Sequence, residues 1–221
     1  MTDNEKAMAE RIAELEALLA EKKKDRKKKP AATRGRAVRA ITQEEYTELI
    51  DTMRTGGAGF KASDRNATAF VVQANLGLRI GDVLNLTPSS FVRDGNRWRL
   101  AVVEEKTGKV RNFTVPQQFM LYIENYCLKN KIRKNDKIFP VSYRTIAEYL
   151  QAVVEYLDLP GEIGTHSFRK FYATNIYTKN GYNIALVQQL LQHSSPDVTQ
   201  RYIGIRPKEV EAAIENNLDL R

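Results

Sequence analysis

The segments THSFRKFYATN (165–175) and LLQHSSPDVTQRYIG (190–204) contain both histidines of the chain, with an arginine and a tyrosine at defined spacings. Thr165 is a residue type that favours helix N-caps. His166 and Arg169 are therefore predicted in the first turn of a helix, three residues apart and on one face. A helix N-terminus attracts anions, because its backbone N–H groups are unpaired and its dipole is positive there. The first segment thus predicts an anion site.

Two further short helices are predicted after this one. An Asn-Gly pair ends the first helix, and Asn183 caps a second that runs through Leu191, with His193 just past its end. A Ser-Pro pair opens the third helix, and Tyr202 falls in its last turn. Tyr202 therefore follows His193 by nine residues, which brings a histidine and a tyrosine to the ends of neighbouring helices.

Helix signals also frame an arginine in the first half of the chain. Thr42 and Glu45 form a capping box, which predicts a helix start and the boundary of the folded domain. A later apolar run stops at Gly77, and Arg79 follows at once. A cation at a helix start is disfavoured unless an anion is near, so the position of Arg79 predicts that it binds a phosphate. Asp82 is the expected partner of this guanidinium, and a plain Arg79–Asp82 ion pair is the simpler alternative.

A β-hairpin is predicted in the middle of the chain. Residues 97–104 and 110–115 are rich in β-forming residue types, and a short polar connection with Gly108 separates them. Lys106 is expected near the tip of this hairpin. Residues 137–139 are a candidate for an added strand. With the surrounding helical patterns, these runs predict an α+β domain that is mainly helical and has one small antiparallel sheet.

The composition indicates a globular protein that binds polyanions. Hydrophobic residues make up 42% of the chain, and no apolar run has the length of a signal peptide or membrane span, which predicts a cytoplasmic protein. The net charge of +8 lies in residues 21–39, which hold ten basic and two acidic residues. Such a run indicates nucleic acid first and an anionic membrane surface second, with a solvated linker as the alternative. The predicted DNA-binding residues are Lys22, Lys23, Lys24, Arg26, Lys27, Lys28, Lys29, Arg34, Arg36 and Arg39.

The N-terminal residues predict a short coiled-coil-like helix. Met8, Ile12, Leu15 and Leu19 follow one another at steps of four and three, which is a heptad seam. Two to three heptads are marginal alone, so weak self-association and docking on the same chain both stay open. The predicted organisation is a heptad helix at 1–24, a basic linker at 25–40 and a catalytic domain at 41–221.

The arrangement of these motifs resembles the tyrosine recombinases, the phage integrase family. H-S-F-R, then Q-H-S-S, then a tyrosine nine residues after the second histidine is similar to the second conserved box of that family. Arg79 and Lys106 match its two upstream landmarks in order. The resemblance covers roughly residues 41–221 and implies the tyrosine recombinase catalytic-domain fold. The sequence differs where Asp82, Lys170 and Gln192 replace the family's usual Glu, His and Gly.

The resemblance implies a phosphoryl transfer on DNA that needs no metal, ATP or other cofactor. Tyr202 would attack a backbone phosphate to give a 3′-phosphotyrosyl intermediate and a free 5′-hydroxyl. Arg79, Arg169 and His193 would hold the non-bridging oxygens, where cations stabilise the charge that a metal ion would otherwise neutralise.

Proton transfers are implied for two further residues. His166 would be the base, because a helix N-terminus disfavours the protonated imidazole. Lys106 would be the acid for the leaving oxygen, with Lys109 as the competing lysine.

The implied partner is double-stranded DNA, bound by a homo-oligomer that forms a tetramer in the synapse. Only the heptad helix and the linker precede the predicted domain, where family members typically have a larger core-binding domain. Recognition of a DNA site by this chain alone is therefore open, and an accessory DNA-binding protein is a possible partner. Two other classes stay open. One is a DNA-binding protein of this fold without productive chemistry, and the other is a nicking-closing enzyme like the type IB topoisomerases.

Overall fold

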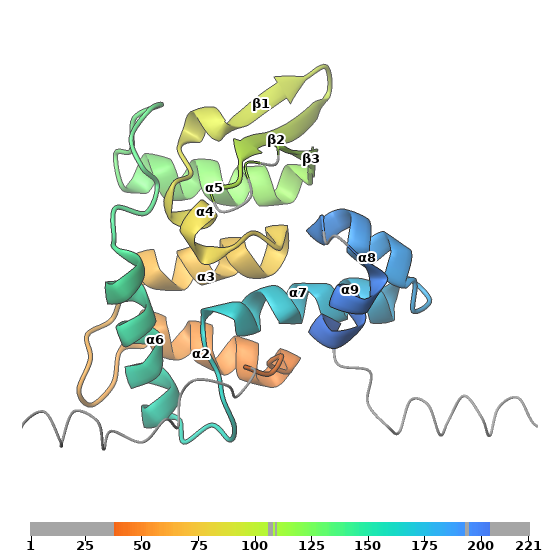
Figure 1. Ribbon diagram of the computed structural model, residues 1–221. Coiled ribbons are helices and arrows are strands. Elements are labelled where there is room, and N and C mark those ends of the chain that lie inside the picture. The colour runs from red at the N-terminus through yellow and green to blue at the C-terminus, as the bar shows by residue number, and fades with distance from the viewer. Residues whose placement is uncertain (1–37, 106–107, 109, 193–194, 204–221) are drawn as a thin grey trace, which may run out of the picture. The chain divides into compact units, whose positions relative to one another are not determined.

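The computed structural model describes residues 38–105, 108, 110–192 and 195–203, as a mainly helical domain with one small sheet (Figure 1). The predicted heptad helix, most of the basic run, Lys106 and His193 lie outside these residues. The elements in chain order are α2 (Gln43–Thr55), α3 (Asp64–Leu76), α4 (Ile80–Leu84), η1 (Pro88–Ser90), β1 (Phe91–Asp94), β2 (Arg97–Val103), β3 (Val110–Val115), α5 (Gln117–Lys129), α6 (Tyr143–Tyr156), α7 (Thr165–Lys179), α8 (Ile184–Leu191) and α9 (Pro196–Ile203). The predicted fold class is confirmed.

The three strands form an antiparallel sheet in the order β1-β2-β3. Leu100 of β2 pairs with Phe91 on one side and with Phe113 on the other, so the predicted hairpin of β2 and β3 is confirmed. The strand predicted at residues 137–139 is wrong. Ile138 is instead buried in the core and donates its backbone N–H to the carbonyl of Leu86 at 2.9 Å.

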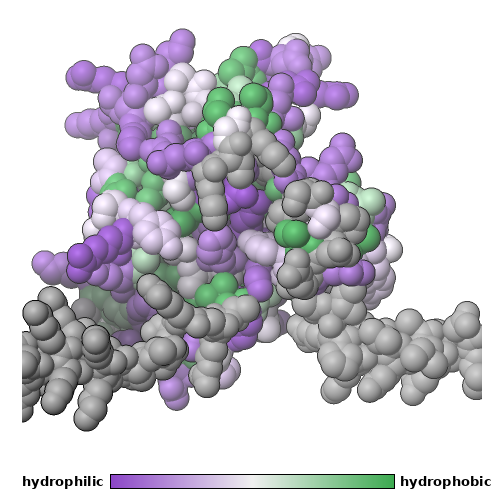
Figure 2. All heavy atoms as spheres, in the orientation of Figure 1, coloured by the Kyte–Doolittle hydropathy of each residue, from purple (hydrophilic) through white to green (hydrophobic). Residues whose placement is uncertain are grey.

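One face of the sheet is exposed and partly apolar. Figure 2 shows hydrophobic atoms, in green, over the strands near the top of the view, with hydrophilic side chains beside them. Val92, Val103 and Val110 are exposed. Val103 pairs with Val110, and Val92 pairs with Arg99, so strand alternation puts the three valines on the same face. The core of the domain therefore lies on the opposite face, where Leu100 is buried.

Capping residues define most helix ends, as predicted. The Thr42 hydroxyl accepts from Glu45 N at 3.2 Å and the Glu45 carboxylate accepts from Thr42 N at 2.8 Å, which completes the capping box of α2. Asn183 caps α8 by accepting from the backbone N–H of Leu186. The predicted N-cap at Thr165 is wrong by one residue. Thr165 is already helical, because the N–H of Gly164 is satisfied by the Ser167 hydroxyl one turn on.

The first half of α7 packs in the main hydrophobic core. Phe168 stacks on Phe70 of α3 with the ring centroids 4.4 Å apart, and Phe171 stacks on Tyr46 of α2 at 4.9 Å. Because aromatic contacts bury large apolar areas, these two pairs fix the helix against α2 and α3. His166 and Arg169, in the first turns of α7, are thereby held on a rigid element.

The second half of α7 contributes to a smaller cluster with α8 and α9, which lie beside it at the right of Figure 1. Its buried members are Ala173, Val187, Leu191 and Ile203, and Tyr202 packs against them. Cys127, the one cysteine of the chain, is buried in the main core, and burial raises the pKa of its thiol. None of the described helices combines the length and hydrophobicity needed to span a bilayer.

Candidate active site

Arg79 lies at the N-cap of α4, directly after the turn that ends α3. Its guanidinium forms an ion pair with Glu104, in which Nη1 and Oε2 are 2.5 Å apart. The expected pairing with Asp82 is wrong. Asp82 instead accepts a hydrogen bond from the backbone N–H of Glu105 at 3.0 Å. The residues after β2 therefore contact both groups: Glu105 binds Asp82 through its backbone, and Glu104 supplies the carboxylate that holds Arg79.

Glu104 was not predicted as a site residue. Its side chain is only 1% exposed, whereas that of Arg79 is 25% exposed. The sequence contains one signal for it, a pair of acids immediately after the apolar strand β2, because a carboxylate at a strand end needs a nearby cation if it is buried. The backbone carbonyl of Glu104 also accepts from Gly108 N at 2.8 Å. Glu104 thus connects Arg79 with the connection between β2 and β3.

Asp82 is buried close to these charges. Burial raises the pKa of its carboxyl, and the charge of Glu104 acts in the same direction. The hydrogen bond from Glu105 N and the charges of Arg79 and Arg169 act in the opposite direction. Asp82 therefore supports the site indirectly, by fixing the strand end that carries Glu104.

Arg169 is almost completely buried, at 2% exposure, in the first turns of α7. Its Nη1 donates to the carbonyl of Gly77 at 2.5 Å, and its Nη2 donates to the carbonyl of Leu191 at 3.1 Å. The guanidinium thus joins the C-cap of α3 to the end of α8. Gly77 adopts φ +61°, and an added Cβ would lie 2.4 Å from the Tyr172 ring, so a side chain at this position would clash with that ring beside the carbonyl that Arg169 binds.

Tyr202 lies in the last turn of α9, as predicted, and its hydroxyl oxygen is buried. Burial raises the pKa of this phenol. Arg169, through its charge and hydrogen bonding, and Arg79, through its charge, lower the pKa. The structure therefore brings the tyrosine of one predicted motif to the arginines of two others. Lys170 also approaches Tyr202, with its Nζ 5.4 Å from the ring centroid.

His166 is exposed and borders a cavity of about 350 Å³ next to Arg79. Its remaining lining includes Ile80, Gly81, Asp82, Glu105 and Tyr143. Tyr143, which is 55% exposed at the start of α6, lines the cavity and was not singled out as a site residue from the sequence. The cavity is therefore the open side of the site, and it leaves Arg79 and His166 accessible from outside the domain.

Gln192 joins the end of α8 to the sheet. It adopts a left-handed conformation with φ +53°, where the family usually has Gly, and its Nε2 donates to the carbonyl of Val110 at 2.9 Å. A left-handed non-glycine residue costs about 1 kcal/mol, and this side-chain bond offsets part of that cost. The predicted roles of Lys106 and His193 fall on residues outside the described part of the chain.

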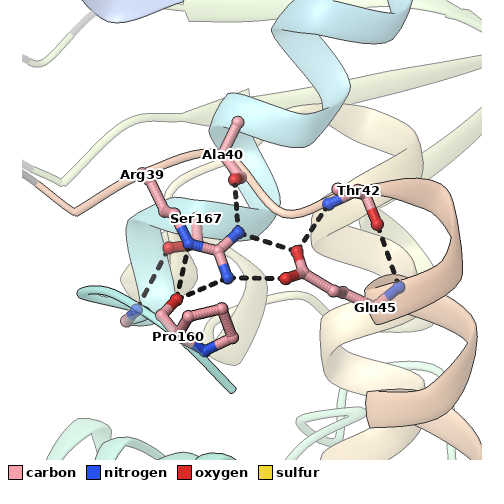
Figure 3. A network of polar contacts seen from close by, with 7 residues as sticks. Arg39, Ala40, Thr42, Glu45, Pro160 and Ser167 are labelled. Atoms are coloured by element: carbon pink, nitrogen blue, oxygen red, sulfur yellow. Dashed lines mark hydrogen bonds and ion pairs between the residues drawn. The ribbon is translucent and has the colours of Figure 1, made fainter.

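Arg39, the last residue of the predicted DNA-binding run, has its hydrogen bonds within the domain (Figure 3). It forms two bonds with the Glu45 carboxylate, at 2.7 and 2.6 Å, and two with the carbonyl of Pro160, at 2.8 and 2.7 Å. A fifth bond reaches the carbonyl of Ala40 at 3.0 Å. The guanidinium of Arg39 therefore joins α2 to the loop before α7, and these internal bonds disfavour the predicted contact of Arg39 with DNA. The other nine predicted DNA-binding residues lie outside the described residues.

Within the described ranges, no group of three or more His, Cys, Asp or Glu side chains is placed to hold a metal ion.

A family model described as the phage integrase family matches residues 39–209. The chain belongs to the phage integrase family. It is 30% identical over 156 residues to the probable integrase/recombinase YoeC of Bacillus subtilis (strain 168), covering 67% of this chain and 82% of YoeC.

Another relative of this phage integrase family member is the tyrosine recombinase XerA of Pyrococcus furiosus. The two are 27% identical over 186 residues, which are 80% of this chain and 61% of XerA. The chain thus spans less than two thirds of the length of XerA.

Solved structures agree with this family assignment. A crystal structure of XerA recombinase has a TM-score of 0.59 at 23% identity and covers 81% of this chain and 65% of its own. XerH site-specific recombinase bound to palindromic difH substrate has a TM-score of 0.62 at 18% identity and covers 80% and 52%. The catalytic domain of bacteriophage HP1 integrase has a TM-score of 0.55 at 18% identity and covers 82% and 96%. The fold is that of a tyrosine recombinase catalytic domain.

Proposed function

We propose that this protein is a site-specific DNA recombinase that cleaves and rejoins double-stranded DNA through a 3′-phosphotyrosyl intermediate. The observation that carries the proposal is the buried hydroxyl of Tyr202, whose pKa responds to both Arg169 and Arg79. A tyrosine hydroxyl within electrostatic reach of two arginines, one of which borders an open cavity with His166, suits attack on a phosphodiester. XerH, a relative of known structure, is described as bound to its difH substrate.

In the proposed step, the Tyr202 hydroxyl oxygen attacks the scissile phosphorus and the bond from phosphorus to the 5′-oxygen breaks. The phenol proton passes to His166, and the departing 5′-oxygen takes a proton from Lys106. The products are a 3′-phosphotyrosyl bond and a free 5′-hydroxyl. Rejoining reverses these transfers with the 5′-hydroxyl of the partner strand. One phosphoester replaces another at each stage, so the reaction consumes no ATP.

The two arginines supply preorganised positive charge. Arg79 is held by Glu104, and Arg169 is held by the carbonyls of Gly77 and Leu191. Because neither guanidinium has to be ordered during the reaction, its full electrostatic effect is available to the transition state. The expected contribution of one such donor is about 10²- to 10³-fold in rate. His193 is the proposed third phosphate ligand.

The test is covalent trapping on nicked duplexes. A pool of nicked duplexes with randomised flanks is incubated with the protein, and the sequences that form adducts are recovered and used as substrates. Tyr202→Phe should bind these duplexes and form no adduct. Tyr177→Phe is the matched control, because Tyr177 lies in the same small cluster, with its ring edge-on to Tyr182.

The outcomes separate the alternatives. An adduct of the parent that joins its strand to a second duplex supports recombination, probed further by tetramer formation on the trapped DNA. An adduct that only reseals its own duplex supports a nicking-closing enzyme. Binding without any adduct would make the protein a DNA-binding member of the family, and an undiminished adduct in Tyr202→Phe would remove Tyr202 as the nucleophile.

A further inference from the structure

Lys170 is the residue next to Arg169 on α7, at a position where the family often has His. Its ammonium nitrogen lies 5.4 Å from the centroid of the Tyr202 ring, within the range of a cation–π interaction. The lysine is half-buried, and Tyr202 is partly buried with its hydroxyl oxygen fully covered. A half-buried lysine whose ammonium lies over the ring of the proposed nucleophile is thus part of the fold without DNA.

We propose that Lys170 is a positioning residue for Tyr202, whose ring it orients and whose ionised form it stabilises when the phenol attacks DNA. This inference rests on the proposed function, in which Tyr202 is the nucleophile. It adds a residue that the reaction scheme does not otherwise use.

The physical argument begins with the cost of burial. Burial raises the pKa of Tyr202 and lowers the pKa of Lys170, so each group alone is driven towards its neutral form. A cation over a neutral aromatic ring gains about 0.5–2 kcal/mol from the ring quadrupole. If the phenol ionises, the ring and oxygen carry a full negative charge, and the attraction becomes a charge–charge interaction in a poorly solvated site. The ammonium therefore favours the phenolate more than the phenol.

The other cations that affect Tyr202, Arg169 and Arg79, are proposed to bind the scissile phosphate. Arg169 and Arg79 lower the pKa of the phenol in the absence of DNA. In the proposed complex, both guanidinium groups bind the scissile phosphate, whose negative charge offsets their effect on Tyr202. Helix α8 (IALVQQLL) contains no ionisable residue, and α9 itself contains Asp197 and Arg201. Lys170 is assigned to the phenol because its Nζ lies over the Tyr202 ring, whereas Arg169 and Arg79 are assigned to the phosphate.

The first test measures ionisation directly in the full-length protein without DNA. 3-Fluorotyrosine is placed at position 202, and its fluorine resonance is followed by NMR as pH is raised. Lys170→Met should raise the pKa of this fluorotyrosine by about one unit, since one unit corresponds to an interaction of this size. Lys170→Arg keeps a cation and should stay near the parent. Lys179→Met is the matched control, because Lys179 is an exposed lysine at the other end of α7.

A titration unchanged by Lys170→Met, or changed equally by Lys179→Met, would overturn the inference. Lys170→Gln provides a second neutral variant if the methionine substitution unfolds the protein. Because this measurement uses no DNA, it has the same meaning whether or not the protein cleaves DNA. Failure of the proposed function appears separately, as an undiminished adduct with Tyr202→Phe.

The second test is the pH dependence of single-turnover cleavage on the trapping duplexes. Lys170→Met should slow adduct formation about tenfold near neutral pH, the rate equivalent of the expected ionisation effect. The deficit should shrink as pH rises, because the phenol then ionises without assistance, and 3-fluorotyrosine at position 202 should restore part of the rate. A deficit that is the same at every pH would instead assign Lys170 a purely structural role.

Discussion

The guanidinium of Arg79 and the carboxylate of Glu104 form an ion pair with an Nη1–Oε2 distance of 2.5 Å, across 25 positions of the chain. The pair joins the start of α4 to the residue that follows β2. Since Glu104 is nearly inaccessible to water, its charge depends on this partner. The position of one proposed phosphate ligand is thus set by the strand that leads into the β2–β3 connection.

Replacing Glu104 should therefore destabilise the domain much more than replacing its neighbour. Glu104→Gln removes the charged acceptor of Arg79 and should lower the free energy of unfolding by about 1.5–3 kcal/mol, the scale of a hydrogen bond to a charged group. Glu105→Gln, at an exposed residue, should stay within about 0.5 kcal/mol. Urea unfolding measures both. Similar small effects for the two variants would show that the ion pair contributes little.

The same substitution should have different consequences at the two arginines. Arg79→Lys keeps a cation beside Glu104 and should cost no more than about 1 kcal/mol. Its loss of the forked donor should nevertheless slow adduct formation about 10²-fold or more. Arg169→Lys cannot reach both Gly77 and Leu191, so it should also lose about 1.5–3 kcal/mol of stability. Unfolding and single-turnover cleavage together distinguish the two, and equal stability losses would contradict this division.

The buried carboxyl of Asp82 predicts a pH-dependent stability difference. Burial raises the pKa of this group in the folded state, so the unfolded chain ionises first as pH rises. As pH rises from the ordinary pKa of about 4 to the higher pKa of the folded state, the free energy of unfolding of the parent therefore falls. It stays lower at all higher pH values. Asp82→Asn cannot ionise, so its stability relative to the parent should increase from about pH 4 to pH 7. Asp51→Asn, on the exposed face of α2, is the control. A difference independent of pH would refute this account.

The basic run should supply affinity for DNA of any sequence, without Arg39. Deleting residues 22–36 should reduce the magnitude of the log–log salt slope of binding by about five, if about six cations contact phosphates. Arg39→Ala should leave this slope unchanged and lower the free energy of unfolding by about 1–2 kcal/mol, because its bonds lie within the domain. Fluorescence anisotropy across a salt series measures the slopes. A slope that survives the deletion would make the lysines a solvated linker.

The acid for the leaving oxygen can be identified by substituting that oxygen. A 5′-bridging sulfur leaves without a proton, and positioned acid catalysis is typically worth about 10²- to 10⁴-fold. Lys106→Ala should therefore be slow on normal DNA and close to the parent on the sulfur-containing strand. Arg79→Lys should stay slow on both. Rescue of Lys109→Ala in place of Lys106→Ala would name the other lysine, and rescue of neither would place the acid elsewhere.

Features decided by neighbouring residues were predictable from the sequence. The Thr42 capping box, the Asn183 cap and the position of Tyr202 in a last helical turn depend on side chains one turn apart or less. Partners from distant segments were not predictable in this way. Asp82 has the helical spacing to reach Arg79, yet the end of β2 brings Glu104 closer, and only the packing of the sheet against α4 decides between them.

Burial was the second quantity that local pattern left open. Arg169 and Arg39 both read as cations available to DNA, because arginine side chains are mostly exposed. In the structure each binds backbone carbonyls of other segments: Arg169 binds those of Gly77 and Leu191, and Arg39 binds that of Pro160. The position of an arginine in a sequence pattern does not show whether a distant segment will supply hydrogen-bond acceptors for its guanidinium.

The Arg39 clamp affects how the protein can be dissected. A shortened chain that begins at Ile41 would keep the capping box of α2 but lose the guanidinium of Arg39, which ties Glu45 to Pro160. It would also lose Val38, which packs close to Gly164: its Cγ1 would lie 3.2 Å from a Cβ added there. The loop that leads to His166 would then be less constrained. Any comparison of the protein with and without its N-terminal extension should cut before Val38. A later cut would change both the site and the affinity for DNA, and a cleavage or binding assay could not separate the two effects.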